Sequence, residues 1–183
     1  ILTTVREKVK IPISVKLSPF YTNMLNLIRR MDKAGVNGFV LFNRLFQPDI
    51  NLETEDHDFP FNASQSADYR LPLRYAGLLH KQIKADICSN TGIFSGGDIA
   101  RMIIAGADAV QVVSAIYKYK VPHIGKMIEA LSQWMEAKGY KSLDDIRGKL
   151  SKEGVKDPYA YKRAQYVDML MKPMNLLKKY PQV

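Results

Sequence analysis

Residues 99–114, IARMIIAGADAVQVVS, decide the fold, because residues 28–43, IRRMDKAGVNGFVLFN, show the same pattern 71 residues earlier. In both copies an apolar helical face runs up to a glycine, Gly35 or Gly106. A short apolar run then ends at a polar residue, Asn43 or Ser114. A glycine in this place is typical of the C-terminal end of a helix. The repeat therefore predicts two helix–turn–strand units of one repeated architecture.

Four short runs rich in apolar and β-branched residues are predicted to be strands, and predicted helices separate them. The strands are expected at 13–17, 39–42, around Ile87 and at 110–113, and the helices at 22–34, 72–83, 96–105 and 122–138. Continuous apolar runs are typical of strands buried on both faces, and the alternation predicts parallel βα units. The expected fold class is therefore α/β, a (β/α)8 TIM barrel of which this chain holds half. A doubly wound sheet is the alternative.

The remaining segments set the expected domain organisation. Residues 44–71 form a long polar connection after the second strand, so they are expected at the carboxyl face of the barrel, where active sites lie. Two further helices are predicted at 142–147 and 158–171. Residues 1–151 are expected to be the half-barrel, and residues 152–183 a helical extension and tail. Because the chain starts without Met and as though inside a helix, we expect it to be part of a longer protein.

Composition and charge argue against several classes of function. The formal net charge is +9, but the basic residues are scattered and no basic stripe interleaves with aromatic residues, so nucleic-acid binding is not expected. No apolar run approaches the length of a membrane span, and no signal peptide is recognisable, so a cytoplasmic protein is expected. A single cysteine, Cys88, excludes a disulfide framework and a cysteine-based zinc site.

Candidate site residues follow the predicted strands. Lys16 ends the first strand among apolar residues, where its charge must reach either an anion or the solvent. Thr91-Gly92 and Ser114 follow the third and fourth strands, in turns that could hold a phosphate or simply let the chain bend. Asn43-Arg44 ends the second strand, where the amide could bind a planar heterocycle and the guanidinium a carboxylate. The three histidines share no ligand spacing, and no metal site is predicted.

Three stretches resemble the dihydroorotate dehydrogenase family over about residues 11–151. They are the lysine strand Val15-Lys16-Leu17-Ser18-Pro19, the stretch AGADAVQVVSA at 105–115, and the C-terminal signature that runs from Trp134-Met135 through Gly139-Tyr140 to Gly148-Lys149-Leu150. The resemblance implies an FMN-containing barrel that oxidises dihydroorotate to orotate in pyrimidine biosynthesis. It also implies that the four predicted strands are strands five to eight.

The resemblance implies roles for individual residues. Lys16 would contact the flavin ring near N1 and O2, and Asn43 would face the substrate. The FMN phosphate would be surrounded by Thr91, Gly92, Val113 and Ser114. The catalytic base of the family lies on a loop after strand four, which these residues do not include, so no catalytic residue is assigned.

The sequence also departs from the family pattern. Asn43-Arg44-Leu45 stands where Asn-Thr-Thr is common, Thr91-Gly92 where Gly-Gly is common, and Ser66-Ala67 where Ser-Gly is common. These changes indicate a divergent branch, and the alternative function is therefore an FMN-binding relative with a different substrate or little activity. Expected partners are a small-molecule substrate and an N-terminal half-barrel or a second copy, because half a barrel leaves open strand edges. A homo-oligomer is expected, with no nucleic acid and no membrane partner.

Overall fold

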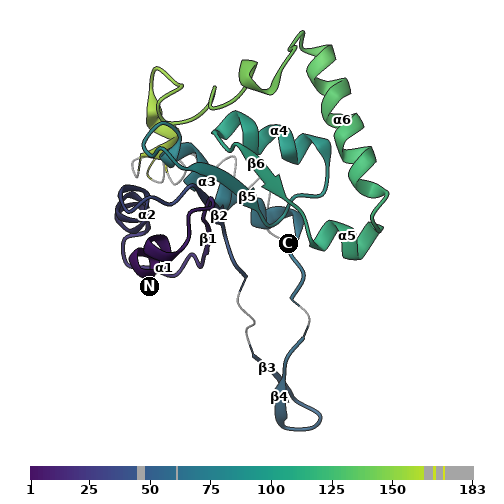
Figure 1. The fold of residues 1–183 in the computed structure, drawn as a ribbon. Helices are drawn as coiled ribbons and strands as arrows, with labels where there is room; N and C mark the ends of the chain where they lie inside the picture. Colours follow the sequence, from purple (N-terminus) through teal and green to yellow (C-terminus); the bar gives the residue numbers. More distant parts are fainter. Residues whose placement is uncertain (45–47, 61, 163–166, 168–170, 172–183) are drawn as a thin grey trace.

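The computed structural model describes residues 1–44, 48–60, 62–162, 167 and 171. A four-stranded parallel sheet forms its centre, with strands β1 (Ser14–Leu17), β2 (Gly38–Leu41), β5 (Asp86–Asn90) and β6 (Ala109–Gln111) (Figure 1). The strands lie in chain order, β1-β2-β5-β6. A doubly wound sheet reverses its strand order at a switch point, whereas a barrel does not. The order is therefore that of half a (β/α)8 barrel, as predicted.

Helices alternate with the strands. They are α1 (Leu2–Lys8), α2 (Met24–Lys33), α3 (Arg70–Leu79), α4 (Gly96–Ala105), α5 (Ser114–Tyr119) and α6 (His123–Ala137). Helices α2, α3 and α4 bury apolar side chains against one face of the sheet, while α6 packs on α4. Leu17, Phe39, Leu41 and Ile87 of the strands are buried together with Ile28, Leu79 and Met102 of the helices. Burial of this apolar face is the main source of stability of the sheet.

The opposite face of the sheet is less covered in the described residues. Strand register places Lys16, Val40, Cys88 and Ala109 in one row across the sheet, so their side chains share this face. None of the four is fully buried, and Lys16 and Ala109 are exposed. The prediction that the strands are buried on both faces is therefore wrong for the described residues, because no further element packs against this row.

The capping residues correctly predict where α4 begins and ends. Ser95 accepts a hydrogen bond from the backbone N–H of Asp98, and the Asp98 carboxylate accepts from the Ser95 backbone N–H at 3.0 Å. This reciprocal pair satisfies donors that the first turn of a helix leaves free. Gly106 ends the helix with φ +123°, and an added Cβ there would lie 2.5 Å from Cβ of His80. Both the backbone angle and the close approach require glycine.

Other predicted bounds need correction. Helix α3 begins at Arg70 rather than Pro72, because the 3₁₀ turn η1 (Ser66–Tyr69) leads directly into it. The fourth strand ends at Gln111 rather than Val113, and α5 begins at Ser114. The helix predicted at 142–147 is the 3₁₀ turn η2 (Leu143–Asp145). The helix predicted at 158–171 begins as the 3₁₀ turn η3 (Pro158–Tyr161), and most of its remainder lies outside the described residues.

The long connection after β2 contains a hairpin that sequence reasoning missed. Its antiparallel strands are β3 (Asp49–Asn51) and β4 (Asp56–Asp58). Figure 1 shows that the hairpin projects well away from the sheet and helices. We refer to residues 48–60, the hairpin and its flanks, as the arm.

Candidate functional site

Polar side chains gather at the carboxyl ends of the four parallel strands. Lys16 lies in β1, Asn43 follows β2, Thr91 and Gly92 follow β5, and Ser114 begins α5 just after β6. Carboxyl ends of parallel strands meet at one edge of a sheet, which is where barrel enzymes carry their active sites. The topology therefore brings together residues that are up to 98 positions apart in the sequence.

A cavity of about 190 Å³ lies at this edge. Five of the six residues predicted to bind cofactor or substrate line it, namely Lys16, Asn43, Thr91, Val113 and Ser114. The lining also includes Arg44, Asn62, Ser64, Asn90 and Gln111. Among the described residues that line it there are two cations and no carboxylate. The composition of the lining favours an anionic ligand.

Gly92, the sixth predicted residue, lies beside this cavity rather than on its wall. Its φ is +72°, and an added Cβ would come within 2.4 Å of the backbone N of Tyr69 and 2.9 Å of the carbonyl oxygen of Gln65. Thr91 before it also has a positive φ, of 75°. Glycine at 92 therefore lets the turn after β5 pack closely against the backbone of η1, which positions Thr91.

Lys16 is held by an amide network. Its Nζ donates to Oε1 of Gln111 at 3.1 Å, and Nδ2 of Asn90 donates to the same oxygen at 3.3 Å. The Thr91 hydroxyl donates to Oδ1 of Asn90 at 3.0 Å. Within the described part of the chain, Lys16 forms no ion pair with a carboxylate. An ammonium carries three donors, so Lys16 keeps charge and donor capacity for a ligand.

The Ser114 hydroxyl is oriented by a segment far from it in sequence. The backbone N–H of Ser64 donates to Oγ of Ser114 at 2.8 Å. A hydroxyl has one donor and two acceptor positions, so this bond uses an acceptor position and leaves the proton free. Ser114 can therefore donate to an anionic oxygen while the Ser64 amide fixes the position of Oγ.

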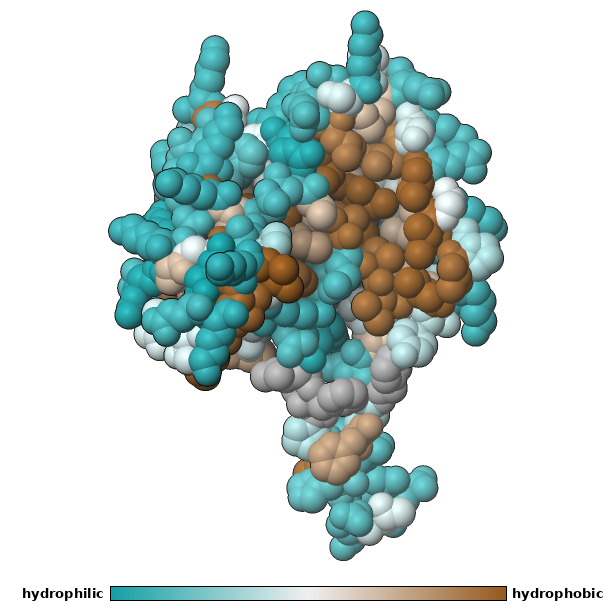
Figure 2. All heavy atoms as spheres, in the orientation of Figure 1, coloured by the Kyte–Doolittle hydropathy of each residue, from teal (hydrophilic) through white to brown (hydrophobic). Residues whose placement is uncertain are grey.

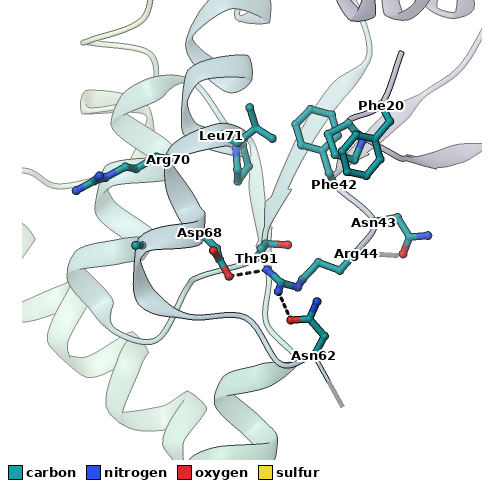
Figure 3. Close-up of a pocket in the computed structure, with 12 residues that line it drawn as sticks. Phe20, Phe42, Asn43, Arg44, Asn62, Asp68, Arg70, Leu71 and Thr91 are labelled. Carbon is teal, nitrogen blue, oxygen red and sulfur yellow. Dashed lines mark hydrogen bonds and ion pairs between the residues drawn. The ribbon is translucent and has the colours of Figure 1, made fainter. Parts of the chain in front are cut away.

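Arg44 has its carboxylate partner within its own chain. Its Nη1 forms an ion pair with Oδ2 of Asp68 at 2.5 Å, and its Nη2 donates to Oδ1 of Asn62 at 2.6 Å (Figure 3). The same Asp68 oxygen accepts from the backbone N–H of Gln65 at 2.8 Å. Arg44 therefore ties the end of β2 to the segment that returns from the arm. Its Nε is buried and has no hydrogen-bond partner in the described residues.

A second, larger cavity adjoins the first. It measures about 440 Å³ and shares Phe42, Asn43, Arg44, Asn62 and Thr91 with the smaller one. Phe20, Asp68, Arg70 and Leu71 complete much of its wall (Figure 3). Asn43 and Arg44 therefore lie where the two cavities meet, and the amide of Asn43 is available to a planar ligand.

Other titratable groups near the sheet have structural roles. Burial raises the pKa of the Cys88 thiol, and the positive charge of Lys16 opposes part of that rise. His80 and His123 are half-buried, and each contacts a backbone carbonyl: Nδ1 of His80 lies 3.2 Å from the Gly106 carbonyl oxygen, and Nε2 of His123 lies 2.8 Å from the Phe94 carbonyl oxygen. The described residues contain no cluster of three side chains suited to a metal ion. No helix among the described residues is long and apolar enough to cross a membrane.

Sequence reasoning missed the residues that hold the predicted ones in place. Gln111 is a polar residue within the run Val110-Gln111-Val112, and that interruption was a signal. Asn90 is the last residue of β5, and Asn43 lies just after the end of β2. This similar position at a strand end was a second signal for Asn90. No local pattern marks Ser64, because its contribution is a backbone N–H.

Comparison with solved structures agrees with the class that the fold and the site define, a segment of a (β/α)8 barrel with a polar site at the carboxyl ends of its strands. A ligand-free dihydroorotate dehydrogenase of Eimeria tenella superposes with a TM-score of 0.60 at 20% identity. The match covers 74% of this chain and 39% of that one. The fold predicted from the sequence is thus confirmed as part of a barrel. No protein-family model matches the chain.

Sequence comparison finds relatives of this chain among the barrel enzymes. The chain is 26% identical over 151 residues to the catalytic subunit of dihydroorotate dehydrogenase B (NAD(+)) of Thermoplasma volcanium, which covers 81% of this chain and 50% of that protein. It is 29% identical over 149 residues to the corresponding subunit of Enterococcus faecalis, and this match covers 78% of this chain and 46% of that protein. The resemblance to dihydroorotate dehydrogenases is confirmed. The chain spans about half the length of the curated relatives it matches.

Proposed function

We propose that this chain is the flavin-binding half of an FMN-dependent oxidoreductase that oxidises dihydroorotate to orotate in pyrimidine biosynthesis. The observation that carries the proposal is the cavity at the strand ends, where Lys16, Asn43, Thr91, Val113 and Ser114 share one wall. Similarity to dihydroorotate dehydrogenases supports the reaction class.

The donor set of the cavity fits FMN. A phosphate needs hydroxyl and backbone donors, and an electron-rich ring system needs a nearby cation. Ser114 keeps a free hydroxyl proton, and Thr91 and Gly92 form a turn with two successive positive φ angles. Lys16 supplies the cation without a neutralising carboxylate in the described residues. These residues would hold the phosphate and the ring of FMN.

A bound FMN would supply the acceptor for the hydride that dihydroorotate loses on oxidation. Lys16 would stabilise negative charge in its surroundings, and Gln111 and Asn90 keep its ammonium in place. Asn43 would hydrogen-bond the planar substrate at the junction of the two cavities. The proton must go to a base that the resemblance places on a loop outside the matched residues, so no residue of this chain receives that role.

The remainder of the barrel is part of the proposal. Strands β1 and β6 form the edges of the described sheet, and each has one paired neighbour. Unpaired edges and an open face favour association, so an N-terminal half-barrel or a second copy would cover the row of Lys16, Val40 and Cys88.

The test is an absorbance spectrum of the purified full-length protein, before and after dihydroorotate is added without oxygen. Flavin bands that bleach on addition support the proposed reaction. If no flavin is present, even after reconstitution with FMN, the roles proposed for Lys16 and Ser114 are wrong.

One observation favours a second candidate, an FMN-binding relative with a different substrate. Arg44 stands in the departure Asn43-Arg44-Leu45, and its guanidinium is committed to Asp68 and Asn62 at the cavity wall. A residue of this size and charge changes what the larger cavity accepts. Flavin bands that persist after dihydroorotate is added, but bleach with another reductant substrate, would support this candidate instead.

A further inference from the structure

The hydroxyl of Ser114 depends on residues 62–68, the segment that returns from the arm to the edge of the sheet. The backbone N–H of Ser64 donates to Oγ of Ser114 at 2.8 Å, across 50 positions of the sequence. This donor belongs to the main chain, so it moves only when the segment itself moves. Whatever holds residues 62–68 in place therefore also decides where the Ser114 hydroxyl can point.

The arm that precedes this segment gives it little support. All six residues of β3 and β4 are exposed, and Figure 2 shows the arm as a largely hydrophilic projection from the body of the protein. An isolated two-stranded hairpin is only marginally stable in water. Within the described residues, the two strands of the arm therefore bury no side chain that could anchor the segment after them.

The guanidinium of Arg44 holds the segment at both of its ends. Nη1 pairs with Oδ2 of Asp68 at 2.5 Å, and Nη2 donates to Oδ1 of Asn62 at 2.6 Å (Figure 3). Ser64 lies between these two partners in the chain. A guanidinium presents its donors in a rigid planar fork, so the two bonds fix the spacing of the partners as well as their positions. We refer to Arg44, Asp68 and Asn62 as the clamp.

A further hydrogen bond connects the clamp to the residue next to Ser64. The Asp68 oxygen that pairs with Arg44 also accepts from the backbone N–H of Gln65 at 2.8 Å. Hydrogen bonds therefore run from Arg44 to Asp68 and on to the main chain at Gln65. The adjacent peptide N–H, that of Ser64, makes the bond to Ser114. Loss of the Arg44–Asp68 pair should release this stretch of main chain and with it the Ser114 hydroxyl.

We propose that Arg44 is a positioning residue for the phosphate of FMN. Through the clamp it fixes the segment that orients the Ser114 hydroxyl, and that hydroxyl donates to the phosphate. This role of Arg44 rests on the proposed function, in which FMN is the ligand of the smaller cavity. Arg44 also lines that cavity, so the competing explanation is direct attraction of the phosphate by its charge. The two explanations differ for Asp68, because removal of its carboxylate opens the clamp but leaves the charge of Arg44 unneutralised.

The test compares the affinity of the full-length apoprotein for FMN and for riboflavin, which lacks the phosphate, by fluorescence titration. Arg44→Met should lower the affinity for FMN about 10-fold, as expected for one hydrogen bond to a charged group, and leave the affinity for riboflavin unchanged. Asp68→Asn should also lower the affinity for FMN. Ser114→Ala should lose at least as much as Arg44→Met. Arg44→Met added to Ser114→Ala should cost no more than about twofold further, because the clamp then has no hydroxyl to position.

The control is Arg30→Met, which changes the net charge equally at an exposed position of α2 that lines neither cavity. It should keep the preference of the unchanged protein for FMN over riboflavin.

Three results would overturn the role of Arg44 and leave the proposed function intact. They are a higher affinity of Asp68→Asn for FMN, additive losses in the double variant, and an Arg44→Met protein that keeps the preference or loses both flavins equally. An unchanged protein that binds neither flavin would instead overturn the proposed function. One that binds FMN no better than riboflavin would overturn the phosphate role of Ser114, and the role of Arg44 with it.

Discussion

Replacement of Gly96 by alanine tests how closely α4 and α6 must pack. Gly96 is the first residue of α4, and an added Cβ would lie 2.5 Å from the backbone N of Leu131 and 2.6 Å from the carbonyl oxygen of Met127. Both atoms belong to the α6 backbone, so no side chain can move aside. Ordinary carbon contacts lie at about 3.5–4.0 Å, so α6 must retreat by about 1 Å.

The expected cost follows from two opposing contributions. Overpacking of a closely packed contact costs about 1–3 kcal/mol. Alanine in place of glycine favours a helix interior by about 1 kcal/mol, and by less at a first helical position. We therefore expect Gly96→Ala to lower the free energy of unfolding by about 2 kcal/mol. For a chain of this size that corresponds to a Tm lower by about 4–8 °C.

The neighbouring glycine provides a matched control. An added Cβ at Gly97 meets nothing closer than Oγ of Ser95 at 3.7 Å, which is an ordinary contact. Gly97→Ala should therefore leave the Tm unchanged or raise it slightly. The assay is thermal unfolding followed by far-UV circular dichroism under identical conditions. Equal Tm values for the two variants would refute the reasoning, since they would show that α6 yields to an added methyl group without cost.

Three further predictions concern other parts of the molecule. Lys16→Met should weaken FMN binding about 10–100-fold, since a hydrogen bond to a charged group contributes about 1.5–3 kcal/mol; fluorescence titration checks this, and the exposed Lys33→Met is its control. Because burial raises the pKa of the Cys88 thiol above 9.0, its alkylation by iodoacetamide should reach half of its maximal rate only above pH 9.0, and a midpoint below pH 9.0 would contradict this. The contribution of the neutral, buried thiol to the free energy of unfolding should be present below pH 9.0 and be lost as the pH rises through the raised pKa. Gly148→Ala should destabilise the chain by at least about 1 kcal/mol, because Gly148 has φ +68° and an added Cβ would clash with the His80 ring; urea unfolding measures this, and Gly125→Ala, which meets nothing within 4 Å, is its control.

Local signals predicted the elements whose ends are fixed locally. Helix α4 was predicted at its observed bounds because Ser95 and Asp98 form its first-turn cap and Gly106 its end, all in the helix or directly beside it. Strand order also followed from sequence, since consecutive parallel βα units lie side by side. These features depend on neighbours in the chain.

The arm and α5 were missed for the opposite reason. Alternation of apolar and polar residues within 49–58 is limited to Ile50 and Leu52, and residues 53–58 are all polar. Both faces of the hairpin are exposed, so no buried face imposes a period of two on the second strand. Val112 and Val113 are β-branched, so their propensity predicts a strand, yet β6 ends at Gln111. Val113 instead lies just before α5, with φ −130° and ψ −59°. Tertiary context overrides their preference for extended structure.

The candidate site likewise contains residues that the sequence marks and residues that only the folded structure brings to it. Strand-end position marked Lys16, Asn43, Thr91 and Ser114, and the structure brings them to one cavity. The partners of Lys16 could not be predicted from its surroundings, because Gln111 lies 95 residues away and reaches it only across the sheet. The Arg44–Asp68 pair joins the two sides of the arm connection, and its formation depends on how that connection folds.

The arm also bears on how the sheet closes during folding. Ser14 of β1 pairs with Gly38 of β2, 24 residues later, whereas Gly38 pairs with Asp86 of β5, 48 residues later, because the arm lies between them. The entropy of loop closure grows only with the logarithm of loop length, so this doubling costs about 0.6 kcal/mol. The sheet can therefore gain, lose or exchange an insertion at this position with little effect on its stability, and the connection after β2 is free to diversify among barrels of this kind.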